Sequence, residues 1–366
     1  MDIDTAPATA TAITELYRGT TADQHRPAGA APPLQPAPSA PLTPSAPPPP
    51  PTPPARLPVR AWLQPSLVAL ILVAAFITCY VGLARAAKPH QLPIAVVGEQ
   101  LSTQIQHALG DSVAVHLEPS FGAADRALRH RDVIAVLTSD AAGDLTLEVA
   151  GANGLSTTTA AQNLVAAYAH DAGRTVTVHD GVPLARFDSR GLAGFYVAFG
   201  VTLSGFVLAQ NILGLARTLH LRHRFAVMAG FSAVAGLVGA TLAGPVLGAV
   251  PAPFIPLAAA LALLAGAAAF STKLLGTFFG TIGIPISTLL LLTVGNSTSG
   301  ASVGTDLLPG AARFVSGLLP PGAAVRAITD LSYFGGAHAV LPLLTLAAWA
   351  VGPALLVWAR SAYRTA

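Results

Sequence analysis

The sequence has little charge and a single cysteine. Only 10% of its 366 residues are Asp, Glu, Lys or Arg, whereas 52% are hydrophobic. An ordinary soluble domain carries roughly 25% charged residues, so one soluble core is not expected. Because Cys79 is the only cysteine, no disulfide framework can form within one chain, and the cysteine does not indicate a redox compartment.

The common catalytic motifs are also missing. There is no H-E-x-x-H and no G-x-S-x-G, and the segment nearest to a P-loop, residues 266–273, lacks the glycine before its lysine. The histidines of residues 88–190 do not have metal-ligand spacing with cysteines or carboxylates. We therefore expect no catalytic residues, no metal and no cofactor, and no enzymatic activity.

What the chain does contain is long apolar runs. The first, residues 67–84, would form about 27 Å of helix, which is just long enough to span a bilayer. Five more spans are expected at residues 192–215, 225–250, 255–272, 274–294 and 339–359. These runs predict a mainly α-helical integral membrane protein with six transmembrane helices and the lipid bilayer as its immediate partner.

The few charges predict the orientation of these helices. Basic residues without acidic neighbours follow the second, fourth and sixth spans: Arg217, Arg222, Arg224, Lys273, Arg360 and Arg364. The positive-inside rule places this side, with both termini, in the cytoplasm of a multi-pass plasma-membrane protein. Because the basic residues are scattered singly at the ends of apolar segments, they do not indicate nucleic-acid binding. We interpret Lys273 as a side chain that snorkels from the end of a helix, the alternative being an intramembrane lysine.

The remaining segments predict four kinds of region. Residues 1–58, which include 15 prolines from Pro27 to Pro58, are expected to form a disordered cytoplasmic tail, and residues 59–87 an interfacial segment with the first helix. Residues 88–190 alternate strand and helix patterns, which predicts a small extracytoplasmic α/β domain between the first and second helices. Its expected strands are 92–97, 113–117, 133–138, 145–149 and 175–178, and its helices are 99–109, 123–129 and about 156–170.

Residues 191–366 are expected to form the remaining five-helix transmembrane domain. Within it, residues 296–338 contain two apolar pieces too short to span, separated by Pro320, Pro321 and Gly322. This pattern predicts a re-entrant segment that dips into the outer leaflet.

Ionisable residues are almost absent from the spans, which argues against a self-sufficient proton- or sodium-coupled carrier. Gln210 and Asn211 are candidates for lining a translocation path, with an inter-helix hydrogen bond as the alternative. Gly276 and Gly280 form a G-x-x-x-G pair, which predicts close helix packing within the subunit or in a homodimer.

Two short segments carry a resemblance to a known family. Residues 319–323 read Leu-Pro-Pro-Gly-Ala and are followed by Arg326 and by Tyr-Phe-Gly-Gly at 333–336, and residues 94–97 read Ile-Ala-Val-Val. These segments resemble the "LPPGAG...A...YF.G" and "VAVVN" patterns of ABC-2-type exporter membrane subunits, in the phage-infection-protein-like branch. The likeness covers roughly residues 60–366. The α/β domain is shorter than the coiled-coil insertions of the larger members, and the proline-rich tail has no counterpart.

The resemblance implies a permease subunit that moves an amphiphilic or hydrophobic substrate outward with energy from a separate ATP-binding subunit. It also implies that Arg217, His220, Arg222 and Arg224 lie in the cytoplasmic turn that contacts this ATPase. The same residues are equally explained by the positive-inside rule. The alternative function is a non-transporting envelope membrane protein whose outer domain binds a ligand or partner.

Overall fold

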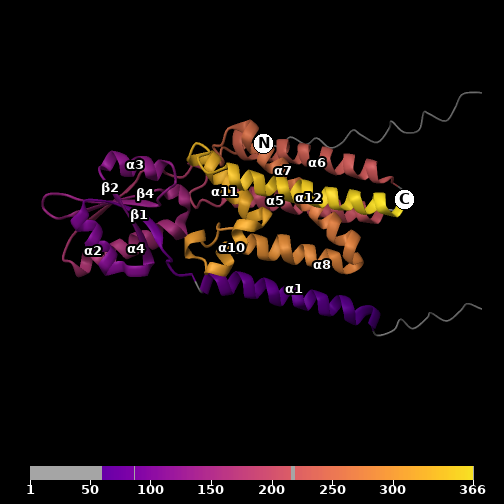
Figure 1. Cartoon of the computed structure of the whole chain (residues 1–366), viewed down its shortest axis with the longest axis horizontal. Helices are drawn as coiled ribbons and strands as arrows, with labels where there is room; N and C mark the ends of the chain where they lie inside the picture. The colour runs from indigo at the N-terminus through magenta and orange to yellow at the C-terminus, as the bar shows by residue number, and fades with distance from the viewer. Residues whose placement is uncertain (1–59, 86, 216–218, 366) are drawn as a thin grey trace, which may run out of the picture. The chain divides into compact units, whose positions relative to one another are not determined.

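The computed structural model describes residues 60–85, 87–215 and 219–365 of the chain (Figure 1). The proline-rich segment 1–58 and Arg217 lie outside the described residues. The described chain is mostly helical and contains one small α/β region. Five of its helical runs are long and apolar enough to cross a membrane, which indicates a multi-pass membrane protein: Leu63–Arg85, Ala193–Gly214, Leu221–Val246, Phe254–Ser297 and Val340–Tyr363.

The helices of these runs overlap the predicted spans, although α1 begins and α7 ends seven residues beyond the predicted positions. Their bounds are α1 Arg60–Arg85, α5 Ala193–Gly214, α6 Leu221–Thr241 with the π-helical η4 Leu242–Val246, α7 Phe254–Phe279 and α12 Val340–Thr365. α7 lies at the centre of the bundle and packs against α5, α6, α11 and α12. Two glycines allow this packing, because a Cβ at Gly205 or Gly236 would lie 2.4 Å from the carbonyl oxygen of Ala265 or Ala258, both in α7.

The fourth run does not divide where the sequence predicted. The expected join at Lys273 is wrong, because α7 continues to Phe279 and Lys273 is a buried residue within it. The break comes at η5 (Gly280–Ile282), where Gly280 adopts a φ of 59° that favours glycine. A Cβ at Gly283 would lie 2.2 Å from the carbonyl oxygen of Leu275, so the chain folds back against α7. The run continues as α8 Gly283–Ser287, the π-helical η6 Thr288–Val294 and α9 Gly295–Ser297.

The α/β region contains the predicted strands and helices. They are β1 Leu92–Val97, α2 Glu99–Leu109, η1 Gly110–Ser112, β2 Val113–Glu118, α3 Phe121–Arg129, β3 Ala135–Ser139, β4 Leu145–Val149, η2 Gly151–Asn153, α4 Leu155–Asp171 and β5 Val176–Asp180. The sheet order is β2-β1-β3-β4-β5, with only the β3–β4 pair antiparallel. β1 lies between β2 and β3, and its register pairs Leu92 with Val113 and Ile94 with Ala135.

Both faces of the sheet are covered. Ile94 and Val96 pack with residues of α2 and α4 on one face, while Ala95 packs with Leu128 of α3 on the other (Figure 1). This arrangement explains why β1 reads as a continuous apolar run. α4 begins at Leu155 after Gly154, and no side chain caps its first turn.

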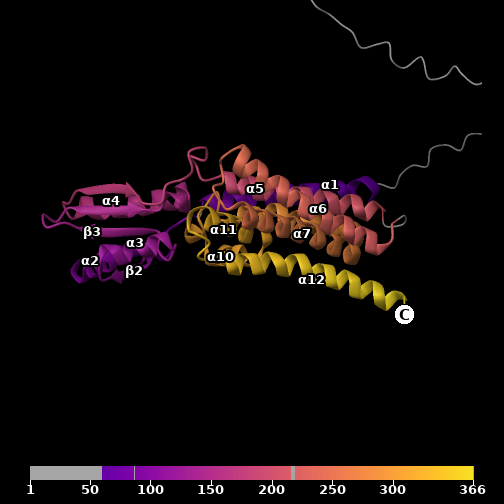
Figure 2. The same cartoon turned by 90° about the horizontal axis from the view of Figure 1, so that it is seen from above.

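The helical half of the chain completes the core of the α/β region. Val303, Leu307 and Leu308 belong to the core beneath α2 and α4, and Phe334 belongs to the core beneath α3. They come from the segment predicted to be re-entrant, which forms η7 Thr305–Leu307, α10 Gly310–Leu318 and α11 Pro320–Tyr333. In both views α10 and α11 lie at the end of the bundle that adjoins the α/β region (Figures 1 and 2). This junction positions the site described next.

Candidate functional site

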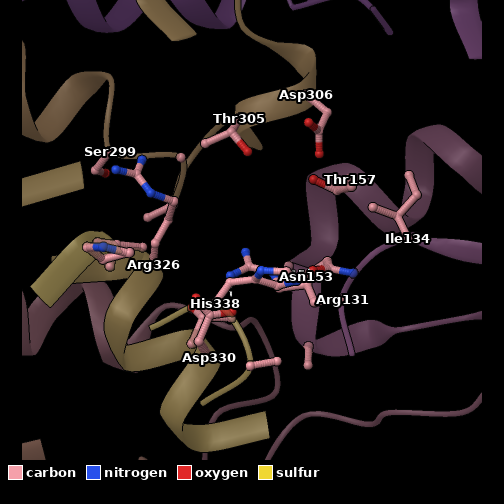
Figure 3. A pocket seen from close by; sticks show the side chains of 18 of the residues that line it. Arg131, Ile134, Asn153, Thr157, Ser299, Thr305, Asp306, Arg326, Asp330 and His338 are labelled. Atoms are coloured by element: carbon pink, nitrogen blue, oxygen red, sulfur yellow. Dashed lines mark hydrogen bonds and ion pairs between the residues drawn. The ribbon is translucent and has the colours of Figure 1, made fainter. Parts of the chain in front are cut away.

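A cavity of about 670 Å³ lies at the junction of the α/β region and the helical bundle (Figure 3). Most of its lining comes from five segments: the turn after α3, η2 with the first turn of α4, the loop after α9 with η7, α11 with the turn that follows it, and the start of α12. All of these segments except the start of α12 contribute polar side chains: Arg131, Asn153, Thr157, Ser299, Thr305, Asp306, Arg326, Thr329, Asp330 and His338.

Arg131 connects the α/β region to the bundle. Its Nη1 donates to Oδ1 of Asp330 at 2.8 Å, its Nε donates to Oδ1 of Asn153 at 3.1 Å, and its guanidinium lies 5.4 Å from the ring centre of Phe334. The backbone of Arg131 has a φ of 64°, which is uncommon for a residue with a side chain. Such a conformation costs about 1–3 kcal/mol and persists where surrounding contacts hold it.

Asp330 is the buried partner of this ion pair, with a side chain only 1% exposed. Its backbone oxygen accepts hydrogen bonds from the N–H groups of Phe334 and Gly336, at the point where α11 ends. The carboxylate therefore lies on a fixed helix end and holds Arg131 from the other half of the junction. Breaking such a pair leaves an uncompensated charge.

Arg326 forms a second set of contacts on α11. Its Nη1 donates to the backbone oxygen and the Oγ of Ser316, both at 3.1 Å, at the C-terminal end of α10. A positive charge is stabilised at this position because the carbonyl groups of the helix end carry partial negative charge. Burial and the like charge of Arg131 lower the pKa of Arg326, while the carboxylate of Asp330 opposes the shift.

Asp306 contributes a second carboxylate to the cavity, besides that of Asp330. It points toward Thr157 (Figure 3), and among the described residues no side chain donates to it. Burial raises the pKa of Asp306, and the charges of Arg313 and Arg131 only partly oppose this. Two further polar atoms, Nδ2 of Asn153 and Oγ of Ser299, are buried without a partner in the described chain. These two atoms could form hydrogen bonds with a ligand in the cavity.

The cavity also has apolar lining residues. Val325 contributes from α11, and Val340, Leu341 and Leu344 contribute from the first turns of α12. Leu341 is 73% exposed and Val340 is 67% exposed, although both begin an apolar membrane span. The cavity lining is therefore both polar and apolar, and its apolar part includes exposed residues at the start of α12.

The three residues predicted to break the re-entrant segment form a tight corner between α10 and α11. Pro320 and Pro321 occupy the start of α11, where proline is well tolerated. A Cβ at Gly322 would lie 2.3 Å from the carbonyl oxygen of Ser316. The corner thus brings α10 close enough for Arg326 to reach its last carbonyl groups.

The other predicted residues lie away from the cavity. Asn211 is exposed, and its Nδ2 donates to the carbonyl oxygen of Val207 one turn earlier in α5. Gln210 is half-buried and, like Asn211, does not line this cavity. Gly276 packs against Leu213 of α5, since a Cβ there would lie 2.4 Å from that side chain, whereas Gly280 marks the chain break.

The basic turn divides into an exposed and an inward part. His220 and Arg222 are exposed, and the ring of His220 contacts that of His223 edge to face at 5.8 Å. Arg224 instead turns into a second cavity with Lys273 and Arg360. The sequence predicted that these cations share a side of the membrane but not that they share a cavity.

Sequence reasoning missed Arg131, Asn153 and Ser299, which have no local motif. Asp306 and Asp330 did carry a signal, because they are the only acidic residues after Arg190. Among the described residues, no group of three or more His, Cys, Asp or Glu side chains is placed to hold a metal ion. No family model, curated protein or solved structure matches the chain.

Proposed function

We propose that the protein is the membrane subunit of an ABC-2-like exporter, a permease that moves an amphiphilic or hydrophobic substrate outward with energy from a separate ATP-binding subunit. The observation that carries the proposal is the cavity at the junction, whose lining is both polar and apolar. Its polar lining includes Asp306 and the unpartnered polar atoms of Asn153 and Ser299, and its apolar lining includes the exposed Leu341. An amphiphile fits such a lining, with its polar head among the polar groups and its hydrocarbon tail along α12.

The path of the chain supports six membrane crossings. The run Phe254–Ser297 would measure about 66 Å as one straight helix, roughly twice the hydrocarbon thickness of a bilayer. The fold-back at Gly283 divides it, and the chain then reaches Val303 in the core of the α/β region. In this proposal α7 and the run α8–η6–α9 are two arms of a hairpin, both termini are cytoplasmic, and the α/β region is outside.

A partner ATPase is tested by purifying the full chain from its own membranes in mild detergent. We expect a co-purifying protein that is photolabelled by an azido-ATP analogue, with ATP hydrolysis stimulated by added amphiphiles. Charge reversal at the exposed Arg222 (Arg222→Glu) should reduce recovery of the labelled protein about tenfold, equal to about 1.4 kcal/mol. The matched control is Arg126→Glu, an exposed arginine on α3 of the α/β region.

Two results would overturn this function. One is wild-type protein without any labelled ATPase, and the other is equal recovery with Arg222→Glu and Arg126→Glu. Amphiphile binding at the junction without an ATPase would favour the non-transporting alternative, in which the outer domain binds a ligand and the helices serve as its anchor.

The orientation has its own test in intact cells. After Cys79→Ser removes the only cysteine, Asp140→Cys in the α/β region should react with an impermeant maleimide from outside. Arg222→Cys should react only after the membrane is permeabilised. Reaction of position 222 in intact cells would exclude the proposed topology.

A further inference from the structure

The second cavity contains three basic side chains and no acidic one. Its volume is about 170 Å³, and it lies between α6, α7 and α12, where it is lined by Leu221, Arg224, Lys273, Thr277, Val357, Arg360 and Ser361. By the same measure one water molecule needs about 10–15 Å³. The cavity therefore has room for a small polyatomic anion.

All three cations lie near one end of the bundle, where they line one cavity. Arg224 follows the start of α6 at Leu221 by three residues, and Lys273 precedes the end of α7 at Phe279 by six. At 1.5 Å per residue these offsets are about 5 Å and 9 Å. The zone of lipid headgroups on each side of the hydrocarbon core is about 5–8 Å thick. In both views this is the end away from the α/β region (Figures 1 and 2).

The cations are held in place but not neutralised. Lys273 is 3% exposed, and the Nε of Arg224 is buried with no acceptor among the described residues. The guanidinium of Arg360 lies 4.3 Å from the ring centre of Phe278, which orients it. Like charges gathered in a poorly hydrated site repel each other unless an anion compensates them. No carboxylate of the described residues lines this cavity, and Asp306 and Asp330, the only acidic residues after Arg190, line the other one.

We propose that Arg224, Lys273 and Arg360 form a binding site for a phosphate group, supplied by the headgroup of an acidic membrane lipid. The cations lie near the end of the bundle, close to the depth of lipid phosphates. The headgroup of a neutral lipid also carries a positive charge, which the three cations would repel. The site is separate from the junction cavity and does not depend on the proposed export function.

The test uses the purified full chain in nanodiscs of phosphatidylcholine, with or without phosphatidylglycerol, and Lys273→Met, which removes the charge but keeps the side-chain length. Phosphatidylglycerol should raise the Tm of the wild type by about 5 °C, as expected for a ligand well above its Kd. Native mass spectrometry should find at least about tenfold less retained phosphatidylglycerol on the variant. Arg222→Gln, which changes an exposed arginine of the same turn, should behave as the wild type.

Further arms separate the sources of phosphate. Arg360→Gln provides a second variant if Lys273→Met does not fold, and it should lose the same response. An equal response to inorganic phosphate at constant ionic strength, with none to phosphatidylglycerol, would keep the anion site and overturn its assignment to a lipid. Equal lipid responses in the wild type, Lys273→Met and Arg360→Gln would overturn the site itself.

Discussion

At the end of the bundle that adjoins the α/β region, Arg131 donates to Asp330 and Arg326 donates to the last carbonyl groups of α10. At the other end, Arg224 and Lys273 share a cavity that no carboxylate lines. The first set of cations is neutralised by the chain itself, and the second is not. The comparison indicates that the charges at the junction stabilise the fold, whereas the charges at the far end are placed to bind an anion from outside the chain.

Removing the buried carboxylate should have the largest effect on the junction. Asp330→Asn keeps the shape of the side chain but leaves Arg131 without its counter-ion, so we expect the free energy of unfolding to fall by about 3 kcal/mol. Chemical denaturation in mild detergent measures it. Adding Arg131→Gln should restore part of the loss, because no buried charge then remains.

The control is the exposed pair of His338 with Asp132 at the rim of the same junction, where both side chains are more than half exposed. Asp132→Asn should cost no more than about 1 kcal/mol. If Asp330→Asn cost as little as Asp132→Asn, the junction charges would be no more structural than those of the far end, and the comparison would be lost.

The corner between α10 and α11 should show the next largest effect, because it places Arg326 against the end of α10. Gly322→Ala would put a methyl group 2.3 Å from the backbone oxygen of Ser316, and we expect a loss of about 1–3 kcal/mol. Gly317→Ala in α10 is the matched control, since a Cβ there meets nothing within 4 Å. That substitution should be neutral or stabilise the helix by up to about 1 kcal/mol. Equal unfolding free energies for the two variants would show that the corner is not tightly packed.

The sequence predicted the α/β region well because its signals are local. The apolar alternation of residues 145–149 and the continuous apolar run of 92–97 both reflect how many faces of each strand are covered, as β4 and β1 show. The long helices were predicted for the same reason, since an apolar run of sufficient length needs no distant partner. The bounds of α5 differ from the prediction by one residue at each end.

The hairpin after α7 and the junction site were not local. The charge of Lys273 resembled a helix end, but the break depends on the backbone of Gly280, one of 34 glycines in the chain. Arg131 and Asp330 are separated by 199 residues. Their pairing follows from how the α/β region docks on α11, and no spacing in the sequence encodes it. Likewise, Val303, Leu307 and Leu308 belong to a core whose other buried members precede them by more than a hundred residues.

The smallest expected effect sharpens the comparison, because the junction also contains the carboxylate of Asp306, which forms no ion pair with the described residues. Burial raises the pKa of Asp306 in the folded protein above its ordinary value of 3.8. Its ionised form therefore destabilises the fold, and this cost disappears as the pH falls through the raised pKa toward the ordinary one. Asp306→Asn, which is uncharged at every pH, should have a higher Tm than the wild type at neutral pH.

This difference should shrink on acidification, as measured by thermal unfolding in detergent across a pH series. Asp171→Asn, at a carboxylate that is 85% exposed, serves as the control and should give no such trend. A constant difference for Asp306→Asn at every pH would mean that the carboxylate has a counter-charge in the protein. With the expected trend, the leftover charge is negative at the junction and positive at the far end. A basic group on a ligand would then suit the first cavity, and a phosphate the second.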